Sequence, residues 1–180
     1  MKGLCEMKDL RRRRGETGFT LIELVAVLII MTILAAVAVA SLGNDSSKVV
    51  AMADSIKSHL RYAQTRAMTT GALYANLDVW GIVLSDSSYY LFQCATPGSC
   101  APAGNQVIAP GENAAVIDVG QQGVSISPGG GTVISFDRFG KPYTNPALTT
   151  ALASDLQVTL SDGSGNSRAV TIRPETGMID

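Results

Sequence analysis

Few side chains in this chain of 180 residues are suited to chemistry. There are three cysteines and one histidine, and no Cys/His or Ser/His/Asp constellation of the kind that supports nucleophilic catalysis is apparent. The loop acids Asp86, Asp118 and Asp162 lack the spacing of calcium ligands, and two thiolates alone do not complete a zinc site. We therefore expect no enzymatic activity, no metal and no cofactor.

Two of the cysteines are close enough in sequence to pair. Cys94 and Cys100 are separated by Ala-Thr-Pro-Gly-Ser, and the Pro-Gly step turns the chain back so that the two sulfurs can come within bonding range. In an oxidising compartment we expect a disulfide, worth on the order of 2 kcal/mol by loop-closure entropy. Two free thiols are the alternative. The single histidine, His59, lies beside an apolar stripe, where packing is a more common role than catalysis.

The third chemical feature is a carboxylate inside an apolar run. Residues 19–42 contain one charge, Glu23. As a helix rising about 1.5 Å per residue, this run is long enough for a bilayer core of about 30 Å. The basic residues 11–14 precede it, so the positive-inside rule keeps the N-terminus in the cytoplasm. A carboxylate in such a helix is costly and needs a partner, which argues against the alternative of a simple uncut signal-anchor.

Residues 18–23, Gly-Phe-Thr-Leu-Ile-Glu, follow a short basic leader and open the apolar run. This arrangement resembles the processing signal of type IV pilins and pseudopilins. The resemblance implies that a prepilin peptidase removes residues 1–18, cutting between Gly18 and Phe19, and that the new amine on Phe19 is methylated. Glu23 becomes the fifth mature residue, a position where the family carries glutamate. The amine of Phe19 on a neighbouring subunit would then neutralise Glu23 and set the register between subunits.

The same resemblance implies the partners and the location. Together with Glu23, Thr20 and Leu21 would join this chain to other pilins or pseudopilins through the N-terminal helix, with an inner-membrane assembly platform as a further partner. The protein would cross the inner membrane once, with a cytoplasmic N-terminus and a periplasmic globular domain, before it enters a periplasmic or extracellular filament. Cys5 would leave with the leader, and Cys94 and Cys100 would lie in an oxidising compartment.

The elements that must position these residues follow from periodicity. Residues 43–70 begin with a polar interruption and then show apolar residues every three or four positions up to a plausible stop at Gly71: Val49, Met52, Ile56, Leu60, Ala63 and Ala67. Residues 71–180 hold short Val-, Ile- and Tyr-rich segments between turn residues: 74–79, 81–84, 89–94, 115–119, 124–127, 133–136, 156–160 and 169–173. The segments 157–160 and 169–172 are expected to form a hairpin.

These elements predict an α+β protein. A long N-terminal helix, transmembrane over residues 19–42 and amphipathic over residues 43–70, would pack on a small antiparallel β-sheet or β-sandwich domain formed by residues 71–180. Residues 61–67, 80–82 and 136–140 resemble the pseudopilin H and FimT subfamily. The expected function is therefore that of a minor pilin or minor pseudopilin, in a type IV pilus or a type II secretion system filament.

Two alternatives stay open, a major pilin and a FimT-like DNA receptor for uptake. Of the 14 Lys/Arg and 15 Asp/Glu residues, six and three lie in residues 1–18, which leaves a mildly acidic remainder. Such a body repels phosphates on average, and Arg168 and Arg173 are the only cations near the C-terminus. We do not expect nucleic acid as a partner.

Overall fold

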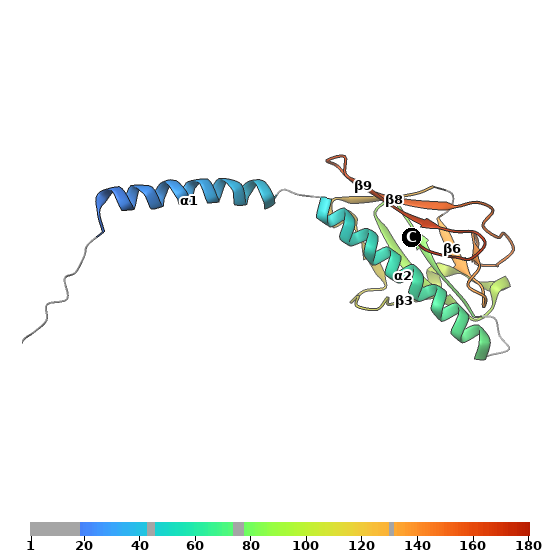
Figure 1. Cartoon of the computed structure of the whole chain (residues 1–180). Helices are drawn as coiled ribbons and strands as arrows, with labels where there is room; N and C mark the ends of the chain where they lie inside the picture. Colours follow the sequence, from blue (N-terminus) through green and yellow to red (C-terminus); the bar gives the residue numbers. More distant parts are fainter. Residues whose placement is uncertain (1–18, 43–45, 74–77, 130–131) are drawn as a thin grey trace, which may run out of the picture. The chain divides into compact units, whose positions relative to one another are not determined.

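The computed structural model describes residues 19–42, 46–73, 78–129 and 132–180, and Figure 1 shows their secondary structure. The leader, Gly18 and the first part of the strand expected at 74–79 lie outside the described residues. The chain divides into two compact units, one up to Asn44 and one from Asp45 onward, and each is described by itself.

The first unit contains a single described helix, α1 (Leu21–Leu42). Its Leu, Ile, Met and Ala residues are mostly strong helix formers, and apolar residues surround the helix instead of forming one stripe. Every described side chain from Phe19 to Val37 is exposed. Over the described residues, no helix was identified as both long and apolar enough to cross a membrane, so the expected membrane span at 19–42 is not confirmed.

The second unit begins with helix α2 (Ser46–Leu73). Its buried positions follow a four-three-four spacing that keeps them on one face: Val49, Ala53, Ile56, Leu60, Ala63 and Ala67. The sequence placed Met52 on this face, but Met52 lies at its flank and is half-buried. The expected stop at Gly71 was also wrong, because one glycine costs a helix only about 1 kcal/mol and does not end it.

Strands of the second unit form two antiparallel sheets. The larger sheet has the order β3-β2-β1-β6-β7, and β4 also pairs with β2. Its strands are β1 (Val79–Leu84), β2 (Ser88–Cys94), β3 (Gln106–Val107), β4 (Val116–Asp118), β6 (Val133–Phe136) and β7 (Pro142–Tyr143). The two segments expected on either side of Trp80 are corrected to one strand that runs through it. The strands β3 and β7 were not expected, because two residues carry no readable alternation.

The smaller sheet has the order β5-β8-β9. It consists of β5 (Val124–Pro128), β8 (Leu156–Asp162) and β9 (Ser167–Ile172). The expected hairpin of residues 157–160 and 169–172 is confirmed, with the pairing extended to Leu156 at one end and to Ser161 and Ser167 at the other. Three short 3-10 turns complete the described elements: Pro97–Ser99, Pro102–Gly104 and Gly120–Gln122.

Helix α2 packs on strands from both sheets, namely β1, β6, β8 and β9, and Figure 1 shows it lying along them. The buried face of the helix and the inner residues of both sheets form one hydrophobic cluster, with Trp80, Tyr89 and Phe136 as its largest side chains. The predicted α+β class, with a helix packed on an antiparallel β domain, is therefore confirmed.

His59 has a structural role in this packing. It is 4% exposed, with Nδ1 2.9 Å from the Tyr89 hydroxyl and Nε2 3.3 Å from the Pro110 carbonyl oxygen. A carbonyl only accepts, so Nε2 carries the hydrogen and Nδ1 accepts from Tyr89. Burial raises the pKa of Tyr89 to about 12, the nearby Glu112 also raises it, and a hydrogen bond from Ser55 opposes them. The histidine thus ties α2 to β2 and to the loop at residue 110.

Candidate assembly site

The residues that the sequence assigned to assembly lie together at the start of α1. Thr20 immediately precedes the helix, and its hydroxyl oxygen accepts from the Glu23 backbone N–H at 3.3 Å. The Thr20 carbonyl oxygen accepts from the N–H groups of Glu23 and Leu24 at 3.1 and 3.2 Å. Thr20 is therefore the N-cap of α1, because it satisfies donors that a first helical turn leaves without intrahelical acceptors.

Glu23 lies in the first turn of α1. A carboxylate there is favoured by the partial positive charge at the helix N-terminus, by about 0.3–1 kcal/mol when exposed. Among the described residues, Glu23 has no ion-pair partner. Its charge is thus offset within the helix only by backbone dipoles, and it is available to a cation from outside the described part of the chain.

Apolar side chains adjoin this carboxylate. Phe19 is 83% exposed and Leu21 equally so. Phe19 and Glu23 line a surface groove on the helix together with Leu24, Val27 and Leu28. An exposed apolar surface of this extent marks an interaction site, and here one carboxylate lies at its end.

The cysteine pair lies in the second unit. Cys94 and Cys100 form a disulfide, the pairing that the sequence predicted, with their Cα atoms 5.4 Å apart. Cys94 ends β2 and is 3% exposed. It belongs to a small hydrophobic cluster with Val79 and Phe92, against which Leu148 also packs. The bridge therefore fastens the loop after β2 to the sheet and takes both thiols out of nucleophilic chemistry.

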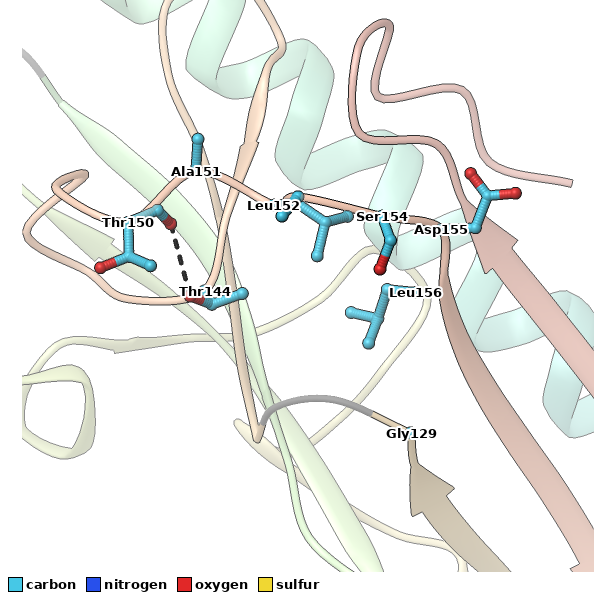
Figure 2. A pocket seen from close by; sticks show the side chains of 9 residues that line it. Gly129, Thr144, Thr150, Ala151, Leu152, Ser154, Asp155 and Leu156 are labelled. Carbon is cyan, nitrogen blue, oxygen red and sulfur yellow. Dashed lines mark hydrogen bonds between the residues drawn. The ribbon is translucent and has the colours of Figure 1, made fainter.

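The domain also contains a pocket of about 260 Å³, shown in Figure 2, between the end of β5 and the segment that leads into β8. Its polar groups are the side chains of Thr144, Thr150, Ser154 and Asp155. Thr144 donates its N–H to the Thr150 carbonyl at 2.9 Å, and the Asp155 carboxylate is bound by Arg173. The described lining thus holds one acid, already paired, and no base beside it for general acid–base catalysis.

Metal and phosphate sites are not supported by the described residues. No group of three or more potential metal ligands occurs within them. Of the two late cations, Arg173 is paired with Asp155 and also lies 4.0 Å from an Asp180 carboxylate oxygen. A cation held between two carboxylates is a poor anchor for a phosphate. Of the two late cations, only Arg168, whose side chain is exposed, is then left as a candidate for binding a phosphate.

Phe19 and Thr20 immediately precede α1, and Leu21 and Glu23 lie in its first turn. Gly18 lies outside the described residues. Sequence reasoning placed Thr20 in the assembly segment but missed its role as the N-cap. The signal was present, since Thr-x-x-Glu before an apolar run is the pattern of a capping box.

Comparison with protein families gives one match. The family described as the prokaryotic N-terminal methylation motif matches residues 13–39, which contain Gly18, Phe19 and Glu23. The match supports the resemblance to type IV pilin-like proteins and methylation of the N-terminus, and it leaves the pseudopilin H and FimT subfamily unconfirmed. No curated protein and no solved structure matches the chain.

Proposed function

We propose that this chain is a minor pilin or minor pseudopilin, a subunit of a type IV pilus or a type II secretion system filament. Prepilin peptidase would cut after Gly18, and the new amine on Phe19 would be methylated. The match to the methylation motif over residues 13–39 carries this proposal. The exposed apolar surface of α1, with one carboxylate in its first turn, supports it further.

Electrostatics explains why assembly requires Glu23. Cutting before Phe19 creates a positive amine next to the positive end of the α1 dipole, so two like charges meet at one place. A carboxylate offsets both, and the interaction strengthens where neighbouring apolar helices exclude water. Glu23 of one subunit facing the Phe19 amine of the next therefore favours one stagger between helices and disfavours others.

Localisation follows from the same mechanism. Before assembly the N-terminus would be anchored in the inner membrane, with residues 46–180 in the periplasm. Association of α1 with the helices of other pilins would then remove its apolar surface from lipid as the inner-membrane platform adds the subunit to the filament. The Cys94–Cys100 disulfide fits an oxidising compartment such as the periplasm.

The proposal is tested by mass spectrometry of filaments sheared from cells that produce the protein. A chain that begins at methylated Phe19, present as a trace of the filament mass, is the expected result. Methylated Phe19 on the dominant subunit would make the protein a major pilin instead. An uncut leader, found only in membranes, would overturn the proposal.

Glu23 is tested separately by Glu23→Val. The variant should still be cut and should remain in the membrane fraction, because it gains an apolar side chain, yet its amount in filaments should fall severalfold or more. Glu23→Asp, which keeps the charge on a shorter stem, is the matched control and should recover part of the incorporation. Equal incorporation of Glu23→Val and the unmodified chain would remove the charge-register argument.

A further inference from the structure

A row of apolar side chains crosses the face of the larger sheet that points away from α2. The strand register places Val116 of β4 opposite Tyr90 of β2, Tyr90 opposite Val83 of β1, and Val83 opposite Val133 of β6. Their neighbours along the strands belong to the core beneath α2, and alternate residues of a strand point to opposite faces. These four residues are named the outer row.

The outer row is only partly covered. Val116 is 43% exposed, and Tyr90, Val83 and Val133 are half-buried. On one side the row adjoins the small cluster of Phe92, the disulfide and Leu148. Asp118 lies on the other side, two residues after Val116 on the same face, with an exposed side chain. Its carboxylate accepts from the backbone and side-chain N–H groups of Gln121 at 3.2 and 3.1 Å and keeps its negative charge at the surface. Four adjacent apolar groups beside a carboxylate suit a partner with an apolar tip and a positive charge.

A tip of that kind occurs in the turn of residues 137–141, named the Phe139 turn. Phe139 is 74% exposed, and the Arg138 guanidinium carbon lies 4.8 Å from the centre of its ring. Lys141 adds a second cation. An aromatic group and a cation stacked together at the surface are typical of the residues that dominate protein interfaces.

The Phe139 turn is held rigidly. The Asp137 carboxylate accepts from the N–H groups of Phe139 and Lys141 at 2.8 and 2.9 Å. Gly140 has φ +79°, a conformation that suits glycine, and its carbonyl accepts from the Gln64 side chain of α2 at 3.0 Å. A rigid anchor loses little conformational entropy when it binds.

The charges of the two surfaces are complementary. Residues 67–137, which include the outer row, contain five Asp/Glu and no Lys or Arg. The Phe139 turn follows at once with two cations, Arg138 and Lys141, against one acid, Asp137, so the turn keeps a positive balance. Attraction between unlike patches and repulsion between like ones would favour contact between the turn and the outer row.

The two surfaces lie at opposite ends of β6. Val133 begins this strand and Phe136 ends it, and the Phe139 turn follows directly. A contact between two different surfaces is heterologous, so one copy can offer its Phe139 turn to a second copy while its own outer row stays open to a third.

We infer that the Phe139 turn of one copy of this chain docks on the outer row of another copy. Phe139 packs between Tyr90 and Val83, and Arg138 approaches Asp118. This inference rests on the filament role in the proposed function and applies where two copies of the chain are neighbours in the filament, because a contact of this small size is weak alone and forms between subunits that α1 already holds together.

The test is disulfide cross-linking of the full chain in detergent micelles, with Cys5→Ser in every copy. Copies with Lys141→Cys, which keep Phe139 and Arg138, are mixed with copies with Val116→Cys and mildly oxidised. Heterodimers should form severalfold more than when Lys141→Cys is mixed with Ala153→Cys, a matched exposed position on another segment. Equal yields with the two partners, or a greater yield of Lys141→Cys homodimers, would overturn the inference.

Charge exchange provides the second measurement. Arg138→Glu on the Lys141→Cys copy should lower the cross-linked yield by about 2- to 5-fold, the size of an exposed ion-pair effect. Asp118→Arg on the Val116→Cys copy should restore it. If neither substitution changes the cross-linked yield, Arg138 and Asp118 do not take part in the contact.

The two proposals fail separately. Methylation and filament entry without the cross-link would end only the docking contact. The cross-link on a chain that is never processed at Phe19 would end only the filament role.

Discussion

The two helices differ in whether the chain's own domain covers their apolar residues. In α2, six small or aliphatic residues form one stripe, and every one of them is at most 2% exposed because two sheets cover it. In α1, every described side chain is exposed although the segment is far more apolar. A stripe of limited width can be covered by the chain's own domain, whereas a helix that is apolar all round needs other molecules on every side.

This difference separates the contributions to stability and to assembly. Substitutions in the face of α2 should change the free energy of unfolding of the domain, and substitutions in α1 should change what the chain associates with. Each prediction below tests that separation, from the largest expected effect to the smallest.

The largest effect is expected for a matched pair of leucines. Leu60→Ala removes a side chain that is 0% exposed and should lower the free energy of unfolding by about 2–5 kcal/mol, because a cavity remains. Leu28→Ala in α1, where the leucine is 55% exposed, should change it by less than about 0.5 kcal/mol. Urea unfolding in detergent, followed by fluorescence of the single tryptophan Trp80, measures both. Equal losses of unfolding free energy in the two variants would contradict the separation between α2 and α1.

A smaller effect is expected from Tyr89, which links α2 to the sheet through His59. Its pKa is about 12 in the folded protein against 10.0 for the free group, so folding favours the protonated hydroxyl. The corresponding stability is fully present below pH 10 and is lost as the pH rises from 10 to 12, by about 2–3 kcal/mol in all.

Urea unfolding repeated between pH 8 and pH 12 measures this loss. Tyr89→Phe should start less stable by about 1 kcal/mol, since His59 loses a hydrogen bond, and should lack that part of the alkaline decline. Tyr90 is the neighbouring residue on the other face of β2, and Tyr90→Phe is the control that should keep the full alkaline decline in stability. A decline that is the same in all three proteins would contradict the assignment to Tyr89.

The smallest effect is expected at the start of α1. Thr20→Ala removes the capping hydroxyl and should weaken the first turn by about 1 kcal/mol, which corresponds to roughly fivefold faster amide hydrogen exchange. The amides of Glu23 and Leu24 report the change, and Thr20→Ser should behave like the unmodified chain. Amides of α2 should be unaffected. Faster exchange along both helices would show that the cap acts on more than α1.

The local pattern of residue types along the sequence was sufficient to predict much of this architecture. The spacing of Ile56, Leu60 and Ala63 identified the buried face of α2, and strand-favouring residues between turn residues placed β6 at its observed bounds. Prediction failed where local preference was weak. Gly71 suggested a helix end but is tolerated inside the last turn, and the two-residue strands β3 and β7 exist only because longer neighbours offer them backbone partners.

By itself, the sequence determined the methylation motif with Glu23, the amphipathic face of α2, and the cysteine spacing, because each depends on residues within a few positions of one another. Tertiary structure alone decided which distant groups meet. His59 bonds a carbonyl 51 positions away, Gln64 bonds one 113 positions away, and the outer row draws one residue from each of four strands. No local spacing encodes such contacts, since they arise only when α2 and both sheets close around one hydrophobic core.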